Sequence, residues 1–226
     1  MGRINKLRSI AIIPARGGSK RLPRKNILPL RGIPLLTRVI RKIKQSSLFD
    51  EIIVSTEDKE ITNIAKKENV LIHDRPNRLA TDYASVTETC LEVLSKNQTD
   101  IFCCIYATAV LIKIDTLQKS FKKFLSDNKT DVLMGVSKYN FHPLKAMSIN
   151  KNGNAKLLFP KLKNTKSQKF PLTRVSNGTF YWARSNEFSK QKTFYAKRLK
   201  IYDVPNSEVS DLDTYEDFIK LKNNFT

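Results

Sequence analysis

The chain has 226 residues, of which 40% are hydrophobic; this suits a single globular domain with one core and excludes a largely disordered protein. Its 41 Lys and Arg residues against 21 Asp and Glu give a formal charge of +20, which favours anionic partners such as a triphosphate, an acidic sugar or nucleic acid. The basic residues are scattered and form no long run, so part of the excess reflects general composition.

Up to residue 137, short apolar runs alternate with helical patterns. In chain order we expect a strand at 9–14, a helix at 33–44, a strand at 51–55, a helix at 58–68, a strand at 70–72, a helix at 85–96, a strand at 100–106, a helix with Asp115 as its N-cap, and a strand at 131–137. This alternation predicts a Rossmann-like α/β fold, in which a mostly parallel sheet carries helices on both faces.

After residue 137 the alternation stops. Asn152 and Gly153 lie between strand-like segments at 145–150 and 155–159, which is typical of a hairpin, and a polar, basic stretch follows at 161–169. Strands at 178–183 and 200–204 and a closing helix at 214–222, with Asp213 or Thr214 near its N-cap, complete the pattern. We therefore expect a single domain over residues 1–226, interrupted by a hairpin-bearing insertion at 139–175.

The cysteines and the N-terminal segment bear on the cellular compartment. Cys103 and Cys104 are neighbours on a predicted strand and point to opposite faces, so they are poor disulfide partners, and Cys90 makes the count odd. This favours a reduced, cytoplasmic setting. The apolar stretch at 10–13 is too short for a signal peptide or a membrane span, so we expect no membrane partner and a basic tail at 1–8.

The loop after the first strand, PARGGSKRLPRKN at 14–26, carries the strongest functional signal. Ligands of open α/β sheets bind beyond the carboxyl ends of the strands. Gly17 and Gly18 allow positive φ and a close backbone approach, and we expect their N–H groups to point at phosphate oxygens. Five cations fall within ten residues, namely Arg16, Lys20, Arg21, Arg24 and Lys25. Without acidic partners they would repel one another, and a bound triphosphate would remove that cost.

Two common nucleotide-binding patterns are absent from this loop. It matches neither the Walker A pattern nor the Gly-x-Gly-x-x-Gly pattern of dinucleotide-binding folds, which disfavours an ATPase or a dehydrogenase.

The loop, as IIPARGGSKRLPRKN, closely resembles the signature of acylneuraminate cytidylyltransferases, also called CMP-sialic acid synthetases. Five further segments resemble the family in order: FDEIIVSTED at 49–58, DRPNRLATDYAS at 74–85, HPLK at 142–145, NGTFYW at 177–182 and SDLDTYEDF at 210–218. The resemblance implies a nucleotide-diphospho-sugar transferase type of fold. It also implies an enzyme that transfers CMP from CTP to the anomeric hydroxyl of an acidic nine-carbon 2-keto sugar and releases pyrophosphate.

The resemblance assigns roles to particular residues. Those implied to bind the nucleotide are Arg16, Gly17, Gly18, Ser19, Lys20, Lys25, Asn26, Arg75 and Ala84. Lys25, Arg16 and Asp213 are implied to be catalytic, with Lys25 foremost in stabilising charge on the α-phosphate and the leaving pyrophosphate. Arg75 would approach the base, or else pack structurally before Pro76. Asp82 is expected to order its loop.

Asp211 and Asp213 match the family's paired Mg²⁺-binding aspartates. Mg²⁺ prefers a few carboxylates together with phosphate oxygens, and both side chains of a strand-like Asp-x-Asp share one face. A metal here could lower the pKa of the sugar hydroxyl or brace the phosphates. For Asp213, capping of the closing helix is the alternative.

The acceptor side departs from the typical sialic acid pattern. YATAVLIK at 106–113 replaces Gln-Pro-Thr-Ser-Pro-Leu-Arg, so Tyr106 stands where Gln would contact the sugar; this resembles the pseudaminic acid branch of the family. Alternatively, Tyr106 packs in the core and Thr108 alone faces the sugar. Lys145 is expected to meet the sugar carboxylate, and His142 to be structural. Arg174 lies near the family's sugar-binding Arg, but with a longer spacing to Asn-Gly.

The insertion at 139–175 corresponds to the family's dimerisation element, so we expect a homodimer in which the hairpin reaches over the partner's sugar site. Three rival functions stay open: a cytidylyltransferase for N-acetylneuraminate or another sugar acid such as KDO, a basic nucleic-acid-binding protein, and a catalytically inactive nucleotide-binding relative. The predicted aromatic residues fall on apolar faces, so we expect no nucleic acid partner.

Overall fold

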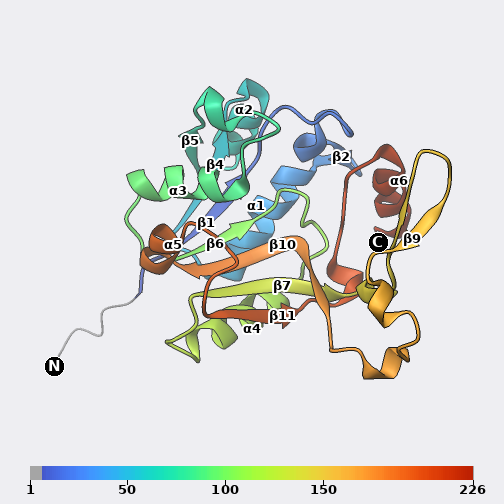
Figure 1. Ribbon diagram of the computed structural model, residues 1–226. Coiled ribbons are helices and arrows are strands. Elements are labelled where there is room, and N and C mark those ends of the chain that lie inside the picture. Colours follow the sequence, from blue (N-terminus) through green and yellow to red (C-terminus); the bar gives the residue numbers. More distant parts are fainter. Residues whose placement is uncertain (1–6, 226) are drawn as a thin grey trace.

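Seven strands form the central sheet of the computed structural model, in the order β11-β7-β10-β6-β1-β4-β5 (Figure 1). Their bounds are β1 Ser9–Pro14, β4 Glu51–Thr56, β5 Leu71–Asp74, β6 Ile101–Ile105, β7 Val132–Lys138, β10 Arg174–Arg184 and β11 Leu199–Asp203. All neighbouring strands are parallel except β10, which runs antiparallel to β6 and β7. The mostly parallel sheet confirms the predicted fold class. The structure describes residues 7–225, so positions 1–6 of the expected basic tail lie outside it.

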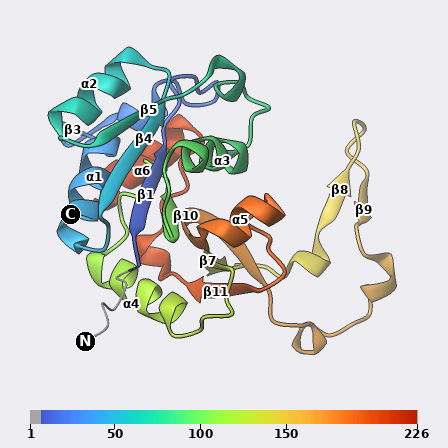
Figure 2. The same ribbon diagram turned by 90° about the vertical axis from the view of Figure 1, so that its left-hand side faces the viewer.

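Helices cover both faces of the sheet (Figure 2). One face carries α1 Leu35–Ser46, α2 Lys59–Lys67, α4 Ile114–Leu125 and α6 Tyr215–Asn224, and the other carries α3 Val86–Lys96 and α5 Ser185–Gln191. Successive residues of β1 alternate between the two cores: Ile10 and Ile12 face one, and Ala11 and Ile13 face the other. An apolar run buried on both faces is what the sequence of this central strand predicts.

Helix starts follow local sequence signals, but α4 starts earlier than expected, α1 starts two residues later, and α5 was not anticipated. The side chain of Asp58 accepts hydrogen bonds from the first turn of α2, and Ser85 and Thr214 form capping boxes at α3 and α6. The N-cap of α4 is Lys113, not Asp115 as expected. A tertiary contact explains the earlier start, because the Glu208 carboxylate accepts the Lys113 N–H at 2.9 Å.

Residues 139–173 form the part of the chain that departs from the α/β body. Strands β8 Met147–Ile149 and β9 Ala155–Leu157 make a separate two-stranded hairpin, as predicted, and its turn contains Gly153 at φ +81°. The hairpin projects away from the main sheet (Figure 2). Strand β10 is longer than expected, because it begins at the base of this segment. A short ladder of β2 Pro29–Leu30 with β3 Ile33–Pro34 was not anticipated. Within residues 7–225, no helix has the length and apolar character needed to cross a membrane.

Candidate nucleotide-binding site

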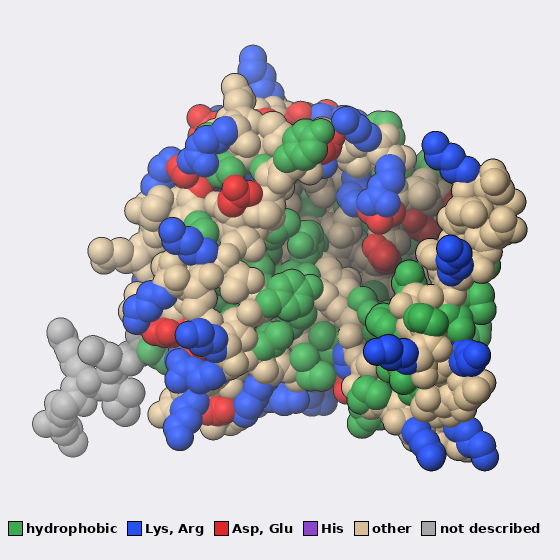
Figure 3. All heavy atoms as spheres, viewed as in Figure 1, with side chains coloured by type: hydrophobic (Ala, Val, Ile, Leu, Met, Phe, Trp, Pro, Cys, Tyr) green, Lys and Arg blue, Asp and Glu red, His purple; other side chains and the backbone are tan. Residues whose placement is uncertain are grey.

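A cavity of about 460 Å³ opens at the carboxyl end of β1. Its lining combines the loop at 14–26 with residues from three other segments: Pro14, Arg16, Gly18, Ser19, Lys20, Arg21, Lys25, Asn26, Arg75, Asp82, Ala84, Val86, Thr89, Tyr106 and Asp213. In the space-filling view, basic and acidic side chains gather around a hollow beside the hairpin-bearing segment (Figure 3). The sequence analysis did not anticipate Val86 and Thr89; their position on the first turn of the helix after the Asp-x-Ala-Ser segment is the signal that could have identified them.

Four of the loop's cations meet at two carboxylates. Arg16 and Lys20 pair with Asp82 at 2.8 and 2.7 Å. Arg21 and Lys25 pair with Asp213 at 2.9 and 3.3 Å. The expectation that these cations lack acidic partners is therefore wrong, because the fold brings two carboxylates from distant segments against the loop. The two cationic neighbours lower the pKa of the Asp82 carboxyl, Lys20 more than Arg16.

The fifth cation anchors the loop to α2. Arg24 adopts a left-handed backbone conformation, φ 58°, and pairs with Asp58 and Glu60. Its hydrogen bonds to Asp58 lower the pKa of that carboxyl. Arg24 is absent from the cavity lining, so it holds the loop rather than facing a ligand.

Gly17 plays a different part from the one predicted. Its N–H donates to Glu57 Oε1 at 2.7 Å instead of standing free for phosphate, and neither Gly17 nor Gly18 has a positive φ. A Cβ on Gly17 would lie 2.5 Å from Asp58 Oδ2, whereas one on Gly18 would meet nothing within 4 Å. Gly17 is therefore required for close packing against the start of α2, and Gly18 borders open space.

Lys25 and Asn26 brace the loop from inside. Lys25 Nζ donates to the Leu212 carbonyl at 2.8 Å as well as pairing with Asp213. Asn26 Nδ2 donates to the Arg16 carbonyl at 2.9 Å. Both residues line the cavity, as does Ser19.

Arg75 and Ala84 form the deeper wall. The Arg75 side chain is almost fully buried, and its Nη2 donates to the Ser55 carbonyl at 2.9 Å. Burial lowers the pKa of Arg75, while nearby Glu57 partly offsets this. Ala84 lines the cavity, and its N–H donates to Thr81 Oγ1 at 3.2 Å. The structure therefore brings both residues to the same cavity as the loop at 14–26.

Asp213 and Asp211 differ in their surroundings. Asp213 faces the cavity and is not the cap of α6, since Thr214 takes that role with Asp217. Asp211 is exposed and is not part of the lining. Among residues 7–225, no three His, Cys, Asp or Glu side chains are grouped as a metal site would need. Asp213 is therefore the member of the pair that fits Mg²⁺ at the cavity, since this ion needs only one or two carboxylates and takes its remaining ligands from phosphates and water.

Tyr106 lies at the cavity wall. It is half-buried and stacks edge-to-face on Tyr181, with ring centroids 6.0 Å apart. The Tyr181 hydroxyl lies 2.7 Å from Ser176 Oγ. Burial raises the pKa of the Tyr106 hydroxyl, which keeps it a neutral hydrogen-bonding group. Thr108 lies outside the lining, and its carbonyl accepts a hydrogen bond from the Ser210 hydroxyl.

The structure does not bring Lys145 and Arg174 to this cavity. Lys145 is exposed at the foot of the hairpin. Arg174 pairs with Asp203 and lines a separate hollow at the base of the insertion. His142 is structural, as expected: its Nδ1 accepts the Leu144 N–H at 3.2 Å, and its Nε2 lies 3.0 Å from the Pro171 carbonyl.

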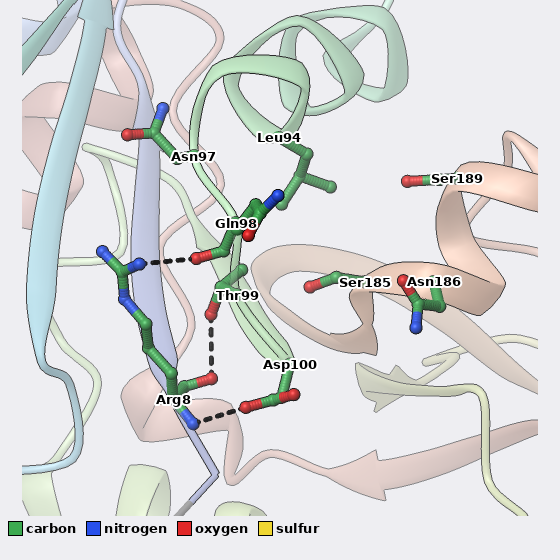
Figure 4. Close-up of a pocket in the computed structure, with 9 residues that line it drawn as sticks. All are labelled: Arg8, Leu94, Asn97, Gln98, Thr99, Asp100, Ser185, Asn186 and Ser189. Atoms are coloured by element: carbon green, nitrogen blue, oxygen red, sulfur yellow. Dashed lines mark hydrogen bonds between the residues drawn. The ribbon is translucent and has the colours of Figure 1, made fainter.

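A second polar hollow, of about 470 Å³, lies at the amino end of β1 and β6 (Figure 4). There the Arg8 backbone N–H donates to Asp100 at 2.7 Å, its guanidinium donates to the Gln98 carbonyl at 2.8 Å, and Thr99 Oγ1 donates to the Arg8 carbonyl at 2.8 Å. Several polar groups of this lining are thus hydrogen-bonded to one another. Among the described residues, Arg8 is the one cation in the lining, in contrast to the several cations that line the cavity at the other end of the sheet.

Comparison with known proteins identifies the family. The family model described as Cytidylyltransferase matches residues 10–225. The pseudaminic acid cytidylyltransferase of Campylobacter jejuni is 33% identical over 217 residues, which cover 93% of each chain. The CMP-N,N'-diacetyllegionaminic acid synthase of Legionella pneumophila is 32% identical, with 92% of each chain covered.

A solved structure shows the same fold. A CMP:2-keto-3-deoxy-manno-octonic acid synthetase complexed with CTP superposes with a TM-score of 0.71 over 96% of this chain and 97% of that one, at 18% identity. At that identity the likeness concerns the fold alone. The family match over nearly the whole chain, with a relative 33% identical, shows that this protein belongs to the cytidylyltransferase family.

Proposed function

We propose that this protein transfers CMP from CTP to the anomeric hydroxyl of a nine-carbon 2-keto sugar acid, pseudaminic acid in preference to others, and releases pyrophosphate. The observation that carries the proposal is the convergence of Arg16, Lys20, Arg21 and Lys25 on one cavity that has Arg75 in its deeper wall. Relatives named for pseudaminic acid and for diacetyllegionaminic acid support an acidic nine-carbon acceptor.

The two carboxylates in the cavity occupy the positions that phosphate oxygens would take. Asp82 and Asp213 each bridge two cations of the loop, so a bound triphosphate would exchange with them for the same donors. Lys25, held by the Leu212 carbonyl, has the least exposed side chain of these donors and suits charge stabilisation at the α-phosphate and the leaving pyrophosphate. Arg16 would assist from the other side of the loop.

We propose Mg²⁺ as the cofactor, held by Asp213 with Asp211 and completed by phosphate oxygens and water. When bound, the metal would neutralise phosphate charge and acidify a coordinated hydroxyl. Pyrophosphate release by the CTP-bound protein should require added Mg²⁺. In the Asp213→Asn variant, added Mg²⁺ should no longer support this release.

We propose that the acceptor sugar lies against Tyr106, with Lys145 and the basic stretch at 161–169 supplied by a second subunit. Residues of one face of the hairpin support this dimer: Met147 and Ile149 are 61% and 73% exposed, while the intervening Ser148 points to the opposite face. An isolated two-stranded hairpin is marginal in water, so an unpacked apolar face favours a partner. Thr108 and Arg174 have less support as sugar-binding residues, because neither lines the cavity and Arg174 pairs with Asp203.

The nucleic-acid alternative has little support from the described residues. Phe49 and Phe121 pack on Trp182, with centroids 5.2 and 4.7 Å apart, instead of forming an exposed stacking surface. The three free cysteines are buried, which favours our proposal of a reduced, cytoplasmic setting.

One assay tests the proposed function: pyrophosphate release from CTP and Mg²⁺ with pseudaminic, diacetyllegionaminic, N-acetylneuraminic and 2-keto-3-deoxy-manno-octonic acids offered separately. We expect turnover with pseudaminic acid to be fastest. Turnover confined to N-acetylneuraminate would refute the acceptor assignment. No release with any acid, from protein shown to be folded, would refute the enzyme.

A further inference from the structure

Three polar side chains are buried side by side next to the nucleotide cavity. Ser55, His73 and Arg75 are exposed by only 0%, 6% and 5%. Ser55 on β4 stands directly opposite His73 on β5, and Arg75 follows β5 by one residue. Because buried polar groups cost free energy unless they are hydrogen-bonded, the bonds among these three define how they are arranged.

Arg75 Nε donates to Ser55 Oγ at 3.2 Å, and Ser55 Oγ lies 3.0 Å from His73 Nδ1. Because Arg75 already donates to the Ser55 oxygen, we assign the Ser55 hydroxyl as the donor to His73 Nδ1. His73 Nδ1 is then an acceptor, and the neutral imidazole carries its proton on Nε2. His73 Nε2 is buried and has no partner within the described part of the chain.

This chain of bonds leaves one end of the Arg75 guanidinium available. Nε and Nη2 are both held by Ser55, through its hydroxyl and its carbonyl. Among residues 7–225, the hydrogen bonds that Arg75 donates go to Ser55 and not to a carboxylate; Glu57 is near enough to raise its pKa but forms no ion pair with it. A buried cation without an ion-pair partner, oriented by two fixed bonds, leaves Nη1 for a ligand acceptor in the cavity.

We propose that Ser55 and His73 are positioning residues that set the orientation in which Arg75 meets bound CTP, and that this relay operates only while His73 is neutral. The inference rests on the proposed function, since it assumes that CTP occupies this cavity. A protonated His73 would present Nδ1–H to Ser55 and would place a second cation beside Arg75. The Ser55 hydroxyl would then lose the acceptor for its own proton.

Other charged groups around His73 act in both directions. Burial is the main cause that lowers the pKa of His73; Lys96 and Arg75 lower it further, and Glu92 and Asp74 oppose the shift. The neutral form therefore persists to a lower pH than for an exposed histidine, whose pKa is about 6.5. CTP affinity should be steady near neutral pH and should weaken on the acid side as His73 gains its proton.

The test is calorimetric titration of CTP into four proteins: wild type, Ser55→Ala, His73→Leu and His73→Asn. Ser55→Ala removes the hydroxyl, and His73→Leu removes the acceptor. His73→Asn keeps an acceptor at the Nδ1 position but cannot titrate. We expect the first two changes to raise Kd by roughly tenfold or more, as expected when a hydrogen bond to a charged group is lost, with kcat at saturating CTP little changed. His73→Asn should bind like wild type near neutral pH.

The acid side of the titration separates positioning from a merely structural role. As the pH falls below the ordinary histidine pKa, the wild-type Kd should rise more steeply than that of His73→Asn, whereas protonation of the CTP phosphate affects both proteins alike. Thermal unfolding checks that each variant is folded; if Ser55→Ala is not, the contrast between His73→Leu and His73→Asn carries the test. Folded variants that all bind CTP like wild type, or His73→Asn as weak as His73→Leu, would overturn the inference. A wild type that fails to bind CTP would refute the proposed function instead.

Discussion

The nucleotide cavity and the hairpin-bearing segment at 139–173 are built on opposite principles. In the cavity, every cation of the loop at 14–26 has an acidic partner, and those partners come from segments far along the chain. In the hairpin, the apolar residues Met147 and Ile149 are exposed and pack on no core. One chain therefore braces the cavity by its own contacts, while its hairpin presents apolar surface that the same chain does not cover.

The ion pairs around the cavity have short distances but contribute little to the free energy of folding. Lys20 is 85% exposed and Asp82 35% exposed, and ion pairs at such exposure contribute little because water screens them. Under the proposed function, a triphosphate would displace these carboxylates at small cost. The carboxylates compensate the charges of the loop cations, which would otherwise repel one another.

We expect the largest loss of activity from a substitution at Lys25, because this residue lies in the cavity proposed to hold CTP. Lys25→Ala should lower kcat/KM by roughly 10²–10³, as loss of one preorganised donor to transition-state charge does. Pyrophosphate release with the accepted sugar measures this. Lys151→Ala, at the exposed tip of the hairpin, is the matched control and should stay active. Equal activity of the two variants would remove Lys25 from the proposed machinery.

A substitution at Ile149 tests whether the exposed apolar face of the hairpin is the proposed dimer interface. Ile149→Asp should convert dimer to monomer and lower turnover with the sugar by about tenfold or more, since interface anchors contribute over 1 kcal/mol. CTP affinity should not change, because the cavity lies within one chain. Light scattering coupled to gel filtration gives the mass. Ser148→Asp, on the opposite face of the same strand, is the control; a dimer that survives Ile149→Asp would argue against this interface.

Gly17 and Gly18 sharpen the distinction between bracing and ligand contact. An added Cβ on Gly17 would collide with Asp58, and relief of such overpacking typically costs about 1–3 kcal/mol. Gly17→Ala should therefore weaken CTP binding by roughly tenfold through displacement of the loop. Gly18→Ala meets open space and should leave the unliganded loop unchanged. Calorimetry with CTP measures both, and identical affinities would show that the loop tolerates movement at Gly17.

Asp58 gives the smallest effect, and it depends on pH. Loss of this N-cap in Asp58→Ala should lower the free energy of unfolding by about 1–2 kcal/mol near neutral pH. Hydrogen bonding by Arg24 lowers the pKa of Asp58 below its ordinary 3.8. The stability that its carboxylate contributes is therefore present above the ordinary pKa and is lost as pH falls through the lowered one.

Urea unfolding at neutral and strongly acid pH would check this behaviour. The difference between wild type and Asp58→Ala should shrink as the pH falls. Asp115→Ala, which breaks an exposed pair with Lys119 at the start of α4, is the control and should cost only a few tenths of a kcal/mol by the usual value of such pairs. A difference that stays constant with pH would show that charge on Asp58 does not matter.

The α/β fold, the position of the basic loop and the family could be predicted from the sequence. These follow from local signals: apolar runs of strand length, helical periodicity, and a basic loop directly after a buried strand. Helix α5 was missed, and the start of α4, expected at Asp115, depends on Glu208, a residue 95 positions away from Lys113.

Which side chains contact one another across distant segments depends on the tertiary structure. Lys25 meets Leu212 across 187 positions of the chain, Gly17 is bonded to Glu57, and Arg174 is drawn to Asp203 rather than to the cavity. Ion pairs and cross-strand bonds of this kind depend on register and on side-chain reach, and neither is encoded in local periodicity. Ser55, His73 and Arg75 also depend on register: Ser55 is distant in the sequence from the other two, and the pairing of β4 with β5 places the three side by side.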